Sequence, residues 1–202
     1  MHKRRLIIFV KAPRPGFVKT RLAKSIGPDE ACAAYRRLAE TLFDSLGTLP
    51  NVELRHAPDD APEEIAPWLR PGWMLDPQGS GDLGDRLKNA FASAFNDGCD
   101  QVAIIGSDCP AVTPDDIQST WEALIDNDLV LGPAHDGGYW LVALRDAYPE
   151  LFSEIDWSTP RVLAQTLVAA KTSDLSVAQL RPLTDIDTLD EWRQFLDDQG
   201  DA

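Results

Sequence analysis

The sequence predicts an α/β protein built on a mostly parallel sheet with helices on both faces. Apolar runs of strand length alternate with amphipathic stretches of helix length along the chain. Residues 5–10 and 101–108 contain uninterrupted apolar runs, as strands covered on both faces require. No linker, repeat or low-complexity tract interrupts the 202 residues, so we expect residues 1–202 to form a single domain.

The first half of the chain is expected to alternate strand and helix with little padding. After the strand at 5–10 comes a polar stretch, and a helix begins at Pro28, a residue that suits the first helical turn. Tyr35, Leu38 and Leu42 then fall on one face of that helix. The next elements are a strand at 52–57, a short broken helix at 62–69, a strand at 73–77 and a helix at 83–95 that buries Leu83, Leu87, Phe91 and Phe95.

The second half begins with the strand at 101–108, and the helix after it has a readable start. Thr113 is expected to be its N-cap, with Pro114 at the first helical position and acidic residues opposing the helix dipole. The remaining elements are strands at 128–134 and 139–145 joined by a turn, a helix at 159–171, a strand near 177–183 and a last helix from Leu189. This order predicts a doubly wound sheet.

Positive charge is concentrated at the start of an acidic chain. The net charge is −14, yet eight of the nineteen Lys and Arg residues lie in residues 1–24, and the first acidic residue is Asp29. An acidic body does not suit nucleic acid or an anionic membrane, whereas a cationic corner on it suits a small anionic ligand. Lys3, Arg4 and Arg5 by themselves are expected to form a solvated basic terminus.

Several classes of protein are excluded by composition. No apolar stretch approaches the ~20 residues of a membrane span. The start MHKRRLIIFV is too short for a signal peptide and runs into KAPRPG, so it is interpreted as a strand. Three cysteines and three histidines are scattered, which argues against a disulfide framework or a zinc site. We expect a cytoplasmic protein.

The stretch after the first strand, residues 11–24, is predicted to bind phosphate. Pro13 and Gly16 shape a tight excursion, and Lys11, Lys19 and Arg21 bring charge to the end of a strand. The P-loop pattern is not met, because Gly16 stands only three residues before Lys19. A solvated basic loop is the weaker alternative.

Two acidic positions are candidates for a metal site. Asp108 follows the strand in IIGSDCP, and an acid there needs a partner such as a metal or a helix N-terminus. One carboxylate with phosphate oxygens and waters is how Mg²⁺ is commonly held, while Thr113 is the better helix cap. Asp185 and Asp187 alternate around Ile186 and so share one face of an extended segment. A second metal carboxylate and a capping cluster are equally compatible with that spacing.

A further polar turn, GPAHDGGYW, places Asp136 and Tyr139 at its rim. Gly137 and Gly138 permit a close backbone approach, although the same pattern is typical of a hairpin turn. Ligands of open α/β sheets collect at the carboxyl ends of the strands. Four loops are expected to meet there: 11–24, 78–85, 106–110 and 132–138.

Six segments together resemble, in order, the motifs of small bacterial GT-A-type glycosyltransferase-like proteins, some of them named for arsenosugar biosynthesis. They are FVKAPRPGFVKTRLA, QGSGDLGDRL, IIGSDCP, LGPAHDGGYWLVAL, WST and TDIDTLDE. The likeness covers nearly the whole chain and implies a GT-A, nucleotide-diphospho-sugar transferase-like fold. The wider superfamily contains both nucleotide-sugar glycosyltransferases and nucleotidyltransferases.

The resemblance also implies roles for individual residues. Lys11, Lys19 and Arg21 occupy the loop that wraps the triphosphate in nucleotidyltransferase relatives. Asp108 stands at the place of the metal-binding acid, although the next residues are Cys109 and Pro110 rather than a true DxD. Asp187 resembles the distal metal ligand of cytidylyltransferase relatives.

These features together predict a Mg²⁺- or Mn²⁺-dependent glycosyltransferase that uses a nucleotide sugar and a small-molecule acceptor. Lys11, Lys19 and Arg21 would neutralise charge on the leaving group, and Asp82 and Arg86 would line the nucleoside or sugar pocket. Pro13 and Gly16 would bind the nucleotide as part of the loop that carries these cations. The sugar or acceptor would be faced by Asp136, Gly137, Gly138 and Tyr139. Asp136 is the first candidate for a general base. The alternatives are a nucleotidyltransferase that releases pyrophosphate, disfavoured by the missing glycine-rich AGG loop, and a non-catalytic nucleotide-binding protein.

Overall fold

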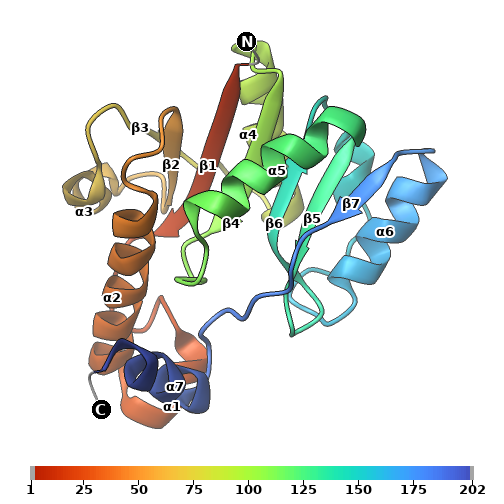
Figure 1. Cartoon of the computed structure of the whole chain (residues 1–202). Helices are drawn as coiled ribbons and strands as arrows, with labels where there is room; N and C mark the ends of the chain where they lie inside the picture. The colour runs from red at the N-terminus through yellow and green to blue at the C-terminus, as the bar shows by residue number, and fades with distance from the viewer. Residues whose placement is uncertain (1–2, 201–202) are drawn as a thin grey trace.

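A seven-stranded sheet forms the centre of the computed structural model, which describes residues 3–200 (Figure 1). The strand order is β3-β2-β1-β4-β6-β5-β7. Every pairing is parallel except those of β6, which runs antiparallel to β4 and β5. The strands are β1 (Arg4–Lys11), β2 (Val52–Ala57), β3 (Met74–Pro77), β4 (Gln101–Gly106), β5 (Leu129–Pro133), β6 (Tyr139–Leu144) and β7 (Val177–Gln179). The predicted mostly parallel sheet is confirmed.

The helices follow the expected order, with one addition. They are α1 (Thr20–Ile26), α2 (Pro28–Leu46), α3 (Pro62–Ile65), α4 (Leu83–Asn96), α5 (Pro114–Asp126), α6 (Val162–Thr172) and α7 (Leu189–Gln199), with 3₁₀ turns η1 (Ala66–Trp68) and η2 (Pro149–Phe152). Helix α1 was not predicted, since residues 11–24 were interpreted as a loop throughout. Helix α6 begins later than expected because residues 156–160 form a turn instead. Among the described residues, no helix is both long and apolar enough to span a membrane.

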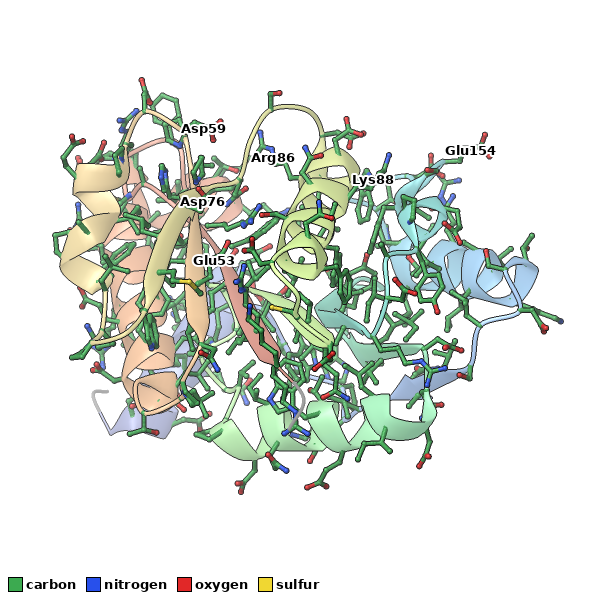
Figure 2. All side chains as sticks on the ribbon, turned by 90° about the horizontal axis from the view of Figure 1, so that it is seen from above. Glu53, Asp59, Asp76, Arg86, Lys88 and Glu154 are labelled. Atoms are coloured by element: carbon green, nitrogen blue, oxygen red, sulfur yellow. The ribbon has the colours of Figure 1, made fainter. Side chains whose placement is uncertain are left out.

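Helices cover both faces of the sheet, as predicted (Figures 1 and 2). On one face Ile8 of β1 packs in a cluster with Phe43 of α2 and Trp121 of α5. On the other face Ile7 joins a cluster with Phe91 of α4 and residues of η2 and α6. Successive residues of β1 therefore serve opposite layers, which explains its uninterrupted apolar run. Leu83 departs from the prediction, because at 42% exposure it lies outside these clusters.

The amino-terminal charges are not all solvated. Arg5 is only 7% exposed and forms ion pairs with Glu53, at 3.0 Å, and Asp97, at 2.8 Å. Glu53 also pairs with Arg55, which contacts Asp76 on β3. Figure 2 shows Glu53 and Asp76 on the part of the sheet between α3 and α4. The expected solvated terminus is wrong for Arg5, because β1 extends to Arg4 and carries Arg5 into this buried ionic chain; His2 lies outside the described residues.

Two capping boxes position the segments that carry the candidate acids. Thr113 begins α5 with Asp116 as its reciprocal partner, and Thr188 begins α7 with Glu191. Each box fixes the start of a helix a few residues after a candidate metal ligand. Helix α7 lies beside α1 at the carboxyl edge of the sheet (Figure 1), where Trp192 packs near Leu22.

The turn between β5 and β6 is packed tightly against the segment before α6. Gly137 has φ +89°, and a Cβ placed there would come closer than 3.0 Å to the carbonyl oxygen of Pro160. The amide of Leu163 donates a 3.0 Å hydrogen bond to the Gly137 carbonyl. The close approach expected at this glycine is therefore real, but the approaching group is backbone of the same chain.

We expect Gly137→Ala to lower the free energy of unfolding by more than about 2 kcal/mol, because it adds a backbone clash to the left-handed strain. Gly72→Ala is the matched control. Gly72 has φ +83°, and no atom lies within 4 Å of the place that its new methyl group would take, so only the conformational penalty of about 1 kcal/mol applies. Urea denaturation of both variants measures the difference. Equal losses would show that the contact with Pro160 does not matter.

Candidate functional site

A cavity of about 410 Å³ opens at the carboxyl ends of β1 and β4. Lys11, Lys19 and Arg86 bring positive charge to it, and Asp108 and Ser158 are also in its lining. A second hollow of about 330 Å³ lies beneath α7 but has no Lys or Arg in its wall. The cationic cavity therefore suits a phosphate-bearing ligand better than the hollow beneath α7 does.

Lys19 occupies the centre of this region in an unusual conformation. It is the N-cap of α1 with φ 47° and ψ 45°, a left-handed geometry that costs of order 1–3 kcal/mol for a residue other than glycine. Its side chain is 1% exposed, and Nζ lies 3.3 Å from Asp108 Oδ2 and 2.9 Å from Asp187 Oδ1. Burial alone would lower the pKa of Lys19, but the two carboxylates outweigh it and raise the pKa, so the ammonium stays charged.

The side chain of Asp187 takes no part in capping α7, the helix that follows it. Thr188 and Glu191 make the capping box, and Glu191 Oε2 accepts the backbone N–H of Asp187 at 2.8 Å. The Asp187 carboxylate instead faces Lys19 and, at 3.4 Å, the guanidinium of Arg21. The spacing allowed either a helix-capping cluster or a second metal carboxylate. Thr188 and Glu191 supply the cap, so the Asp187 carboxylate is available for another role.

The segment carrying Asp187 is tied directly to the loop after β4. The backbone N–H of Ile186 donates to the carbonyl of Asp108 at 3.2 Å. Asp185 and Asp187 therefore flank a residue fixed beside Asp108. Burial, followed by the negative charge of Asp108, raises the pKa of Asp185 to about 7, with Lys19 acting in the opposite direction. The pKa of Asp185 is therefore raised chiefly because its carboxyl group is buried.

This arrangement fits a divalent cation only in part. Across residues 3–200, no three His, Cys, Asp or Glu side chains are close enough together to hold a metal ion by themselves. Asp108 and Asp187 nevertheless converge on one point, because both contact the same nitrogen of Lys19. Mg²⁺ is commonly bound by one or two carboxylates together with phosphate oxygens and waters. The donor set therefore fits such an ion in company with a phosphate ligand.

Arg86 is held in the cavity by Gln78, the first residue of the expected loop 78–85, to which the sequence assigned no role. Gln78, 4% exposed, donates from Nε2 to the carbonyls of Val10 and Arg55, both at 3.0 Å, and so joins β1 to β2. Its Oε1 accepts a 3.2 Å hydrogen bond from Arg86. A polar residue directly after a strand was the only signal available for Gln78. In Figure 2, Arg86 lies at the start of α4, facing the loop that carries Asp59.

Tyr35 links two of the segments that line the cavity, the ends of β1 and β4. The hydroxyl of Tyr35, on α2, accepts the backbone N–H of Lys11 at 2.8 Å and is hydrogen-bonded to Ser107 Oγ at 2.9 Å. Burial raises the pKa of Tyr35 far above its ordinary value, so it remains a neutral hydroxyl. This bridge holds the ends of β1 and β4 at a fixed separation. Asp82 also lines the cavity and caps α4 by accepting the backbone N–H of Asp85.

Three predicted nucleotide-binding residues lie outside the cavity lining. The carbonyl of Pro13 accepts hydrogen bonds from Cys32 Sγ and Arg36, so this residue anchors the loop to α2. Gly16 turns the chain at φ +82° in open space. Arg21 is 60% exposed and reaches only the outer side of Asp187. Their arrangement shapes the loop that presents Lys19.

The predicted substrate-facing residues of the β5–β6 turn are only partly near the cavity. Asp136 Oδ1 accepts the backbone N–H of Gly138 at 2.9 Å, as in a hairpin turn, and its charge contributes to the raised pKa of Asp185. The expectation for Tyr139 is wrong, since its ring packs in the second core and its hydroxyl is buried near Thr166 of α6. Tyr139 and Trp140 are neighbours on β6 and pack against the cores on opposite faces of the sheet. The sequence alone did not show that both rings would be covered.

Comparisons with known proteins agree with this geometry. Residues 46–159 match the family described as "Uncharacterized protein conserved in bacteria (DUF2064)". The crystal structure of a candidate nucleotide-diphospho-sugar transferase from Desulfovibrio desulfuricans is 36% identical, with a TM-score of 0.86 over 93% of this chain and 84% of that one. The expected likeness to GT-A-type transferases is thereby confirmed.

Curated relatives carry a more specific name. Phosphoenolpyruvate guanylyltransferase of Chloroflexus aggregans is 26% identical over 197 residues, which cover 93% of this chain and 95% of the relative. Phosphoenolpyruvate guanylyltransferase of Sphaerobacter thermophilus is 28% identical over 140 residues, 69% of this chain and 68% of the relative. A synthetase of CMP-2-keto-3-deoxy-manno-octonic acid, complexed with CTP, shares the fold at 11% identity, with a TM-score of 0.58 over 98% of this chain and 99% of that one. The chain belongs to the DUF2064 family, and its fold is that of the nucleotide-diphospho-sugar transferases.

Proposed function

We propose that this protein is a metal-dependent nucleotidyltransferase, which transfers the nucleotidyl group of a nucleoside triphosphate to a small phosphorylated acid and releases pyrophosphate. One observation carries the proposal. The buried ammonium of Lys19 lies between Asp108 and Asp187 at the edge of a cavity that also contains Lys11 and Arg86. Cations and paired carboxylates at one point suit a polyphosphate with its divalent ion.

The choice of nucleotidyl transfer rests on the relatives that span the chain. Two curated phosphoenolpyruvate guanylyltransferases match it, one over nearly its full length. Guanosine triphosphate and phosphoenolpyruvate are therefore the first pair to test. Glycosyl transfer, the sequence-based expectation, becomes the second candidate. It is favoured by the likeness to the Desulfovibrio desulfuricans protein.

The chain's own residues would divide the work between the two ends of the triphosphate. Lys19 and Lys11 would neutralise charge that develops on the pyrophosphate as its bond to the α-phosphorus breaks. Arg86, held by Gln78 and the Gly81 carbonyl, would fix the phosphate chain in one orientation. Asp108 and Asp187 would hold Mg²⁺ or Mn²⁺, which supplies Lewis-acid stabilisation when bound.

With a phosphorylated acceptor, the reaction needs no general base, which was the role expected of Asp136. The attacking atom would be a phosphate oxygen that is already negatively charged at neutral pH, and it would form the new bond to the α-phosphorus. No proton then has to be removed from the acceptor. Asp136, the first candidate for a general base, is needed only for an acceptor hydroxyl, as in glycosyl transfer.

The products distinguish the two transfers. With Mg²⁺, guanosine triphosphate and phosphoenolpyruvate, we expect acceptor-dependent release of pyrophosphate, measured by a coupled phosphate assay and by chromatography of the nucleotide products. Release of a nucleoside diphosphate from nucleotide sugars, with no pyrophosphate from any triphosphate, would support glycosyl transfer instead. Nucleotide binding without turnover on a panel of acceptors would leave only a binding protein.

We expect Lys19→Met to weaken binding of guanosine triphosphate with Mg²⁺ by about 10- to 100-fold, because a charged hydrogen-bond donor is lost. Lys24→Met is the control, since Lys24 is an exposed residue on the same helix, α1. Isothermal titration calorimetry compares the two variants. Equal affinities for both would remove Lys19 from the phosphate site.

Asp187→Asn should raise the Mg²⁺ concentration needed for nucleotide binding by at least about tenfold, because one of two converging carboxylates is neutralised. Asp190→Asn makes the same chemical change at an exposed position in the first turn of α7 and should have little effect. The Mg²⁺ requirement of both variants is measured by titrating Mg²⁺ at a fixed nucleotide concentration and recording the shift in melting temperature. An unchanged Mg²⁺ requirement in Asp187→Asn would contradict its role as a ligand.

A further inference from the structure

The turn that precedes α6 carries the WST segment, to which the roles above assign nothing. We propose that Ser158 is a positioning residue for the acceptor, and that its corner of the cavity is the acceptor subsite. The inference rests on the proposed nucleotidyl transfer. It concerns which wall of the cavity the small phosphorylated acid occupies.

The residues that line the cavity come from two parts of the chain. Apart from Ser158, the residues lining it all lie between Phe9 and Asp108. These include the cations Lys11, Lys19 and Arg86, which the proposed function assigns to the triphosphate. Ser158 is thus the contribution of the carboxyl-terminal half of the chain to this cavity. A second substrate has to meet the triphosphate from a side that the nucleotide leaves open. We assign it to the wall that carries Ser158, because the cations assigned to the triphosphate all come from the other part of the chain.

The backbone of Ser158 is held in a sparsely populated conformation. Its φ is +63°, in the left-handed region that residues other than glycine rarely adopt. The surrounding turn is fixed by Asp156, whose backbone N–H donates to Gln165 Oε1 at 2.9 Å and whose carboxylate accepts from Gln165 Nε2 at 2.7 Å. Arg161 pairs with the same carboxylate at 3.1 Å. Such conformations persist where the surroundings impose them, and they concentrate at functional sites.

Two glycines clamp the ends of this segment. A Cβ on Gly84, in the first turn of α4, would lie 2.6 Å from the Phe152 carbonyl oxygen and 2.8 Å from Trp157 Nε1. At the other end, Gly137 admits the backbone of Pro160. One contact comes from α4, the helix that carries Arg86 and follows Asp82, and the other comes from the β5–β6 turn. Together they restrict the position of the segment that contains Ser158.

The chemistry of the corner indicates the ligand. A serine hydroxyl is a neutral group that can donate one hydrogen bond to an anionic oxygen. Arg86 lines the same cavity, so a phosphate or carboxylate bound there could meet one guanidinium and one hydroxyl donor. This suits a small acid that carries both groups, oriented by the hydroxyl rather than bound chiefly by charge.

The test is steady-state kinetics of Ser158→Ala and Ser158→Gly with guanosine triphosphate, phosphoenolpyruvate and Mg²⁺. Both variants lack the hydroxyl, but glycine adopts the left-handed conformation without strain, so it separates loss of the donor from a failure to fold. We expect the KM for phosphoenolpyruvate to rise about tenfold in both, with kcat and the KM for the nucleotide changed less than about threefold. Ser153→Ala, in the same segment but outside the cavity lining, is the control.

The outcomes separate this inference from the proposed function. If the wild-type protein releases no pyrophosphate with phosphoenolpyruvate, the proposed function fails with this acceptor and the subsite falls with it. If the wild type turns over but both variants keep its KM for phosphoenolpyruvate, only the role of Ser158 is refuted. A rise in the KM for the nucleotide alone would place Ser158 on the triphosphate side and also refute it.

Discussion

The contact of Lys19 with Asp108 and Asp187 is the interaction on which the rest of the site depends. It joins the loop after β1, the loop after β4 and the segment before α7, which lie far apart in sequence. A buried ammonium without partners would be strongly destabilising, whereas the two carboxylates are partly exposed to solvent. The buried Lys19 therefore requires the two segments that carry Asp108 and Asp187. The left-handed backbone of Lys19 is tolerated because this contact and the buried neighbours of α1 hold it in place.

The fold and the meeting of Lys19 with Asp108 could be predicted because both follow from periodicity and topology, whereas the role of Asp187 came from the family resemblance. The uninterrupted apolar runs of β1 and β4 required cover on both faces, and parallel strands bring their carboxyl ends to one edge. Lys19 and Asp108 had to meet there once both were placed after such strands. Asp187 was less determined by spacing, and its place depends on the hydrogen bond between Ile186 and Asp108.

What sequence reasoning missed was decided by tertiary contacts. Helix α1 is only 7 residues long and is stabilised by packing of Leu22 against α2, which its local pattern does not show. Arg5 and Gln78 are polar residues buried by partners on other strands, and no local signal identifies such partners. At Gly137 the pattern showed that something must come close. It could not show that the approaching group is Pro160 rather than a ligand.

In the proposed reaction Asp108 and Asp187 interact with both Lys19 and the divalent ion. This affects how the metal and the nucleotide bind. Asp108 and Asp187 both pair with the one ammonium of Lys19, and no third acidic ligand among the described residues completes a metal site. A divalent ion alone must compete with a buried ammonium for two carboxylates. An ion that arrives with a polyphosphate brings further oxygen ligands and offers Lys19 an alternative anion. Metal and nucleotide should therefore bind with positive and reciprocal coupling, and the buried lysine is the group through which that coupling acts.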